Sequence, residues 1–232
     1  MNTFAQQLKW QFILLQKNNI IGISLGVTVI YGAVLFFLRD TTTIDKVLVS
    51  LILNDSAVIG YFFIALSIYT EMKHQILAAI FVSPVSSHHY ILSRALSLSI
   101  IGTVCSVGPA WIIKGFSFDI FAFTFGALGI CLLSTLLGIV ILTYADEFLK
   151  FTMLSVPVFL IFVNLPLADY LGAIDLGLIL HIFPIQGGLN LIADSLDEHS
   201  AMSWTSVVSL VLWIPVFYVA AHRFFSSKII HQ

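Results

Sequence analysis

Few residues of this 232-residue chain have the types and spacing that catalysis or metal binding needs. The chain contains neither the H-E-x-x-H motif of zinc proteases nor the G-x-x-x-x-G-K-[ST] loop that cradles nucleotide phosphates. His88 and His89 are neighbours, but adjacent side chains on a helix point about 100° apart, and no third ligand accompanies them. Cys105 and Cys131 lie in separate apolar runs and indicate neither a disulfide nor a zinc site. We therefore expect no catalytic residue, no metal and no cofactor bound by this chain.

The composition indicates a membrane protein. Hydrophobic residues make up 59% of the chain and charged residues 9%, with a mean hydropathy of +1.03. A soluble domain carries about 25% charged residues, so ten basic and twelve acidic side chains cannot cover a soluble particle of this size. The lipid bilayer is therefore the expected solvent. A secreted disulfide scaffold, a nucleic-acid binder and a disordered regulator are excluded.

Apolar runs predict an all-α membrane protein that forms a single transmembrane domain over residues 1–232. A crossing needs about 20 apolar residues, and six charge-bounded runs qualify: 20–38, 50–70, 91–113, 120–144, 151–167 and 204–221. Asn54 and Asp55 fall in the second run, and we place them at its outer end, where either side chain can cap the helix. Residues 1–18 predict an amphipathic interfacial helix, because these apolar residues share one helical face: Phe4, Leu8, Phe12 and Leu15.

The basic residues predict the orientation of the chain. With six spans and a cytoplasmic amino terminus, seven of the ten lysines and arginines fall in cytoplasmic segments, in agreement with the positive-inside rule. A further apolar stretch, 170–192, would weaken this bias if it crossed the membrane, and it contains Asp175, His181 and Pro184. Within the outer segment 168–203 we therefore expect a broken helix pair, re-entrant or flat on the surface, between spans five and six. Both termini are then cytoplasmic.

The longest cytoplasmic connection, residues 71–90, has an internal pattern. Its apolar residues lie at helical spacing on one face, Ile76, Leu77, Ile80 and Phe81. Ser83-Pro84 then ends the helix, because the residue before a proline avoids the α region, and Ser86 or Ser87 can cap the next helix. This pattern predicts a short helix held between two spans, which could contact a partner or simply pack on the bilayer.

The stretch from Asn54 to Ser99 resembles the corresponding part of type-2 ABC exporter permeases, most closely the bacterial subgroup of fluoroquinolone-export permeases. In that family a span ends in Glu, and a coupling helix, a small-residue-Pro turn and a Tyr-Leu-x-Ser-Lys/Arg motif follow. The matching residues here are Glu71, 76–82, Ser83-Pro84, Tyr90, Leu92, Ser93 and Arg94. Weaker similarities cover 146–149 and 183–186.

The resemblance implies the permease subunit of an ATP-driven exporter in the bacterial cytoplasmic membrane, which moves a hydrophobic or amphiphilic small molecule out of the cell. It implies two separate ABC ATPase subunits that hold ATP and magnesium, and a second six-span permease, either the same chain or a paralogue. The residues implied in ATPase coupling are Glu71, Lys73, Ile76, Leu77, Ile80, Phe81, Ser83 and Pro84. Those implied in an outer gate are Asp175, His181, Phe183, Pro184 and Gln186.

Alternatives stay open for the chain and for single residues. A passive membrane anchor or assembly subunit would need no coupling helix. An intramembrane enzyme has only scattered Ser and Thr residues, Cys105 and His181 as candidate groups. Glu71 is either a solvated carboxylate at the end of a span or a structural anchor, and Arg94 is expected to snorkel to the inner surface.

Overall fold

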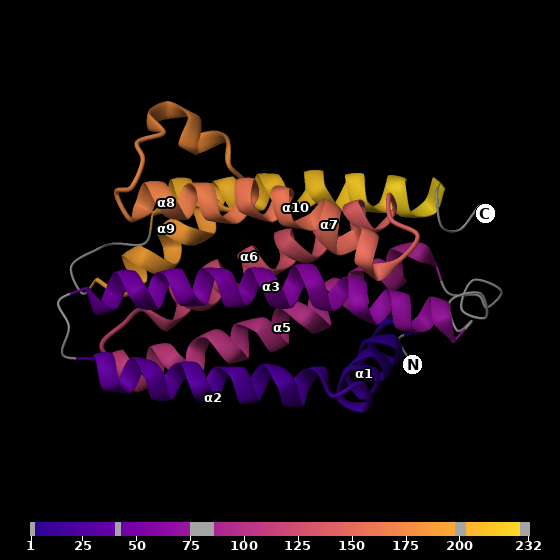
Figure 1. Cartoon of the computed structure of the whole chain (residues 1–232), viewed down its shortest axis with the longest axis horizontal. Coiled ribbons are helices and arrows are strands. Elements are labelled where there is room, and N and C mark those ends of the chain that lie inside the picture. Colours follow the sequence, from indigo (N-terminus) through magenta and orange to yellow (C-terminus); the bar gives the residue numbers. More distant parts are fainter. Residues whose placement is uncertain (1–2, 40–42, 75–85, 198–202, 228–232) are drawn as a thin grey trace.

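The computed structural model describes residues 3–39, 43–74, 86–197 and 203–227, and every regular element in those ranges is helical. Six helical segments in this part of the chain are long and apolar enough to cross a membrane: α2 (Ile20–Leu38), α3 (Ile44–Lys73), α5 (Ser87–Lys114), α6 (Ile120–Leu142), the composite Phe148–Tyr170 and α10 (Trp204–Phe225). They run along the long axis of the molecule (Figure 1). The predicted all-α class with six spans is confirmed, and the chain is a multi-pass membrane protein.

Helix α6 forms the centre of the bundle. Within its most apolar window 83% of the residues are buried, against 22% for α2 and 17% for α10. Glycines bring α3 against it, because a Cβ atom on Gly60 would lie 2.5 Å from the Cys131 carbonyl oxygen and one on Gly138 would lie 2.7 Å from that of Tyr61. Close backbone approach of this kind stabilises apolar helices in a bilayer, where lipid tails remove the hydrophobic driving force between them.

The end of the bundle where α3 finishes and α5 begins is called the Glu71 end below. Helix α1 (Thr3–Lys17) lies obliquely there and packs against α5 (Figure 1). It joins α2 through a tight turn in which Asn19 has a φ of 57°, a left-handed conformation that asparagine tolerates better than most residues. Leu15 of α1 is buried in the same cluster as Phe225, near the end of α10. Phe4 of α1 lies against His89 and Phe225 lies against Tyr90, so the first and last described helices both reach the beginning of α5.

The fifth span is not a regular helix. It consists of α7 (Phe148–Phe159), a π-helical turn η1 (Leu160–Asn164) and α8 (Leu165–Tyr170). Pro157 lies in the last turn of α7, and Pro166 lies in the first turn of α8. Proline removes a backbone donor and clashes with the preceding turn, which explains why the helix changes its winding between these two positions.

The segment between the last two spans is a broken helix pair, as predicted. A 3-10 helix η2 (Gly177–Ile182) is followed by α9 (Gln186–Ser195), which packs on α6 and α10. Gly188 lies against Ile130, ten residues into α6, whereas the Ser195 carbonyl accepts a 3.0 Å hydrogen bond from the Asp119 amide at the start of α6. At 1.5 Å per residue, α9 begins about 15 Å inside the bundle. It is a re-entrant helix rather than one lying flat.

The expected cap at Asn54 and Asp55 is wrong. Helix α3 begins at Ile44, so both residues lie about three turns inside it. The Asn54 amide donates to the Ser50 carbonyl at 3.0 Å, one turn back, and caps no helix end. The sequence interpretation missed the first part of α3, because the charges of Asp45 and Lys46 interrupt the apolar run on which it relied.

Candidate functional site

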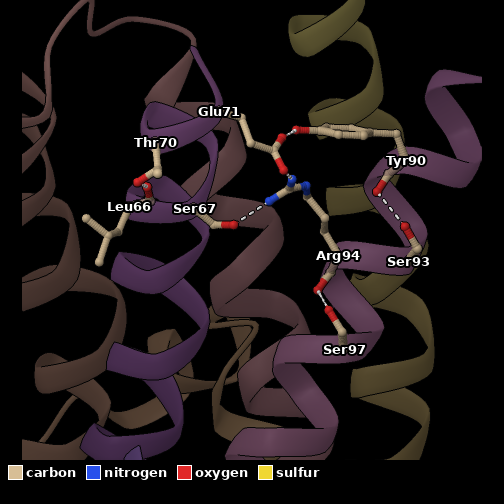
Figure 2. A network of polar contacts seen from close by, with 8 residues as sticks. All are labelled: Leu66, Ser67, Thr70, Glu71, Tyr90, Ser93, Arg94 and Ser97. Carbon is tan, nitrogen blue, oxygen red and sulfur yellow. Dashed lines mark hydrogen bonds and ion pairs between the residues drawn. The ribbon is translucent and has the colours of Figure 1, made fainter. Parts of the chain in front are cut away.

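A buried polar network joins α3 to α5 at the Glu71 end (Figure 2). Ser67 and Glu71 are four residues apart on α3, and Tyr90 and Arg94 are four residues apart on α5, so each pair lies on one face of its helix. Arg94 Nη2 donates to Glu71 Oε1, and Arg94 Nη1 donates to Ser67 Oγ at 2.5 Å. Two i, i+4 pairs thus face each other across the helix contact.

Tyr90 completes the network. Its hydroxyl donates to Glu71 Oε2 at 2.9 Å, so both carboxylate oxygens of Glu71 are hydrogen-bonded. The Arg94 guanidinium carbon lies 4.7 Å from the centre of the Tyr90 ring, a cation–π distance. The same ring stacks on Phe225 at 5.6 Å, which extends the contact to α10. One end of three spans is therefore held by a single aromatic ring and one ion pair.

Burial makes this ion pair costly to break. Glu71 is 3% exposed and Arg94 is 2% exposed, so neither charge is screened by solvent. Glu71 also lies in the last turn of α3, where the negative end of the helix dipole disfavours a carboxylate. Removal of one partner from a buried pair costs about 3–5 kcal/mol, because the other charge stays buried without compensation. The pair therefore fixes the end of α3 on the start of α5.

A second polar contact at the same end joins α5 to α10. The rings of His88 and His222 stack with centres 3.7 Å apart and planes 8° apart. His88 Nδ1 lies 2.9 Å from the Tyr218 hydroxyl, and Ser87 Oγ lies 3.1 Å from His222 Nε2. The beginning of α5 is thus tied to α3 on one side and to α10 on the other.

These contacts decide between the two sequence interpretations of Glu71. The carboxylate is not solvated, and Glu71 is an anchor between two helices. The expectation that Arg94 snorkels to the inner surface is wrong, because its guanidinium is buried and paired inside the bundle. An arginine on its own helix would reach for water, but the facing carboxylate offers a closer partner. Lys73 is exposed, two residues beyond Glu71.

The other residues predicted to couple to an ATPase lie outside the described residues: Ile76, Leu77, Ile80, Phe81, Ser83 and Pro84. The described chain reaches His74 on one side of this connection and resumes at Ser86 on the other. The Ser86 side chain accepts a 3.3 Å hydrogen bond from the His89 amide and so caps α5, as predicted for Ser86 or Ser87. The helix that follows the connection therefore has a defined start at Ser87, three residues before Tyr90.

The residues predicted to form an outer gate lie in and beside the re-entrant segment, at the opposite end. His181 and Gln186 line one cavity of about 550 Å³ between η2, α9 and α10, together with Asn190 and hydroxyl groups of α10. Gln186 is buried, and its Nε2 donates to Asn190 Oδ1 at 2.7 Å. These two predicted residues are brought together by the fold, and Asn190, which the sequence interpretation missed, joins them at i, i+4 spacing.

The three remaining gate candidates do not line this cavity. Asp175 Oδ1 accepts a 3.0 Å hydrogen bond from the Gly177 amide and faces a separate hollow beside Asp169. Phe183 is half-buried and Pro184 is buried, in the break between η2 and α9. Phe183 and Pro184 therefore shape the turn by which the chain re-enters the bundle.

The described residues show no arrangement typical of an active site. No group of three or more His, Cys, Asp or Glu residues in them is close enough to share a metal. Gly22-Ile23-Ser24-Leu25-Gly26 fits the G-x-S-x-G pattern of serine hydrolases, a match that the sequence interpretation overlooked. The segment lies within α2 rather than at a strand-to-helix turn, and the Ser24 hydroxyl donates to the Ile20 carbonyl at 2.9 Å. This serine is therefore not a nucleophile elbow.

Comparison with known proteins adds one match. The sequence model of the family described as "Fluoroquinolones export permease protein family" matches residues 2–232, nearly the whole chain. No curated protein matches the chain.

Proposed function

The chain belongs to the fluoroquinolones export permease protein family, and on that premise we propose that it is the membrane-spanning subunit of an ATP-driven ABC exporter. Its cargo is a hydrophobic or amphiphilic small molecule that leaves the cell. Separate ATPase subunits bind ATP and magnesium and drive the cycle, because this chain has no phosphate-binding loop of its own. A second six-span permease, identical or paralogous, completes a path between two bundles.

The observation that carries this proposal is the buried network of Glu71, Arg94 and Tyr90. It ties the helix that enters the 71–90 connection to the helix that leaves it. A force applied to the connection would move α3 and α5 together, since separating them would leave Glu71 and Arg94 charged and without a partner. The stacked His88 and His222 pass the same displacement to α10. A passive anchor subunit would need none of this linkage.

The proposed orientation places the Glu71 end in the cytoplasm of a bacterial cell, at its cytoplasmic membrane. The positive-inside bias supports this assignment, as seven of ten basic residues then lie on the cytoplasmic side. ATPase subunits would contact the 71–90 connection there, through Lys73 and the apolar residues Ile76, Leu77, Ile80 and Phe81, with the turn at Ser83-Pro84 holding them in place. The re-entrant helix α9 and its cavity would gate release at the opposite face.

Purification in mild detergent tests this function. An affinity-tagged chain should co-elute with an ATP-binding chain of separate origin, and the complex should hydrolyse ATP. The variant Ile76→Asp should stay in the membrane but lose the ATPase, because a charge disrupts an apolar contact face. Elution of the wild-type chain without any ATP-binding protein, from cells that perform the export, would contradict the proposal.

A further inference from the structure

A cavity of about 210 Å³ opens between α2 and α3, away from the network and from the re-entrant segment. One carboxylate, that of Asp55, faces it. Asn54 adds an amide and Ser24 a hydroxyl, which donates to the Ile20 carbonyl; the other walls are aromatic or aliphatic. Because the Asn54 Nδ2 group donates to Ser50, its carbonyl oxygen is left as an acceptor. No lysine or arginine lines the cavity.

Asp55 lies deep in the membrane. It follows the exposed Lys46 by nine residues on α3, about 13 Å at 1.5 Å per residue, and Glu71 lies sixteen residues further on, about 24 Å away. Since the hydrocarbon core is about 30 Å thick, Asp55 is near its midplane. An ionisable group at this depth is costly and marks a functional site by default.

The described residues give Asp55 no hydrogen bond and no ion pair. The other two carboxylates of α3 are paired: Glu71 with Arg94, and Asp45 with Lys114. Asp55 is half-buried, and at this depth the part that the protein leaves uncovered faces the bilayer rather than bulk water, so a carboxylate without a partner is expensive here. Its partner is therefore expected to come from outside the chain.

We propose that the cavity between α2 and α3 binds the cationic head of an amphiphile, a protonated amine, with Asp55 as its counter-ion. The carboxylate supplies the charge, the Asn54 carbonyl oxygen accepts an N–H bond, and the rings of Tyr31 and Phe63 in its walls favour a cation over a neutral group. The aliphatic walls receive the first carbons of the tail. The volume suits a head group, since whole drug-sized ligands need about 300–1,000 Å³.

The proposal deepens the proposed function, on which it rests for the idea that the bound cation is cargo. The competing explanation is that Asp55 simply takes up a proton and stays neutral in the bilayer. In that case a neutral amide would serve equally well at this position. Replacement of the carboxylate therefore separates the two explanations.

The test uses the purified full-length chain in nanodiscs of neutral phosphatidylcholine, without any ATPase. Binding of phenylbutylammonium and of its neutral isostere phenylbutanol is measured by saturation-transfer NMR against empty nanodiscs. The variants are Asp55→Asn, Asp55→Glu and the control Asp146→Asn, whose carboxylate is exposed between α6 and α7. Thermal unfolding is recorded for each variant.

Asp55→Asn should bind the cation about tenfold or more weakly while its binding of the alcohol is unchanged, since one desolvated charge contact is lost. Asp55→Glu should retain most of the affinity, and Asp146→Asn should match the wild type. Asp55→Asn should unfold at a higher temperature, because an unpaired charge at membrane depth is removed.

Equal affinity of wild type and Asp55→Asn for the cation would overturn the proposal, as would wild-type binding no greater than that of empty nanodiscs. Parallel loss of cation and alcohol would also overturn it, because it would indicate a structural role. The assay contains no ATPase, so its result is independent of whether ATP drives the chain. A failed co-purification would contradict the proposed function but would not affect the evidence for the cation site.

Discussion

Breaking the Glu71–Arg94 pair one residue at a time should destabilise the protein far more than removing both residues. In Glu71→Leu, Arg94 stays buried with only Ser67 and the Tyr90 ring as partners. In Arg94→Leu, Glu71 stays buried with only the Tyr90 hydroxyl. Each loss costs about 3–5 kcal/mol. At about 2–4 °C per kcal/mol for a chain of this size, the unfolding midpoint should fall by about 6–20 °C.

The double variant should recover most of this loss. Two leucines of similar bulk leave no charge in the contact, and such replacements of buried pairs are often neutral or stabilising. The measured coupling between the two positions should therefore be about as large as the two single effects added together. A thiol-reactive dye provides the assay, since Cys105 and Cys131 are both buried and become reactive on unfolding.

The Asp45–Lys114 pair at the opposite end is the matched control. Its side chains are 50% and 22% exposed, so water screens the charges. Exposed pairs contribute about 0–1 kcal/mol, and Lys114→Leu should lower the midpoint by no more than about 4 °C. If Glu71→Leu and Arg94→Leu melt no lower than Lys114→Leu, the anchor role assigned to the buried network is refuted.

Two further predictions concern packing and topology. Gly60→Val should reduce the yield of folded protein or lower its melting temperature, because a Cβ there meets a backbone oxygen at 2.5 Å. Gly22→Val should be tolerated in the same thermal assay, because a Cβ at Gly22 has nothing within 4 Å. A cysteine at Asp197 should react with a membrane-impermeant thiol reagent on intact cells and one at Ser227 should not; the reverse pattern would invert the proposed orientation.

The apolar runs predicted the number of spans because length and hydropathy decide membrane crossing almost alone. The expected second span, 50–70, shows the limit of this reasoning, because α3 begins at Ile44, six residues before that apolar run starts. Charged residues in the first turns of a span break the apolar pattern without ending the helix. For the same reason Asp55 was assigned to a helix end, although it lies inside the span.

The partner of Glu71 was beyond prediction from the single sequence. Helical spacing puts Ser67 on the same face as Glu71 and Tyr90 on the same face as Arg94, but which faces meet depends on how α3 and α5 rotate against α6. That rotation is set by close contacts such as the one at Gly60, which cannot be predicted from the neighbouring residues in the sequence. The re-entrant segment was easier, because Asp175, His181 and Pro184 interrupt its apolar stretch and a further crossing would weaken the positive-inside bias.

The most direct test of the central claim is ATP hydrolysis by the chain together with its co-purified ATPase in nanodiscs. The account predicts that transported amphiphiles stimulate the wild-type complex, and that Ile80→Asp in the 71–90 connection abolishes the stimulation while the permease remains folded. Stimulated hydrolysis that is unchanged in a well-expressed Ile80→Asp variant would contradict it.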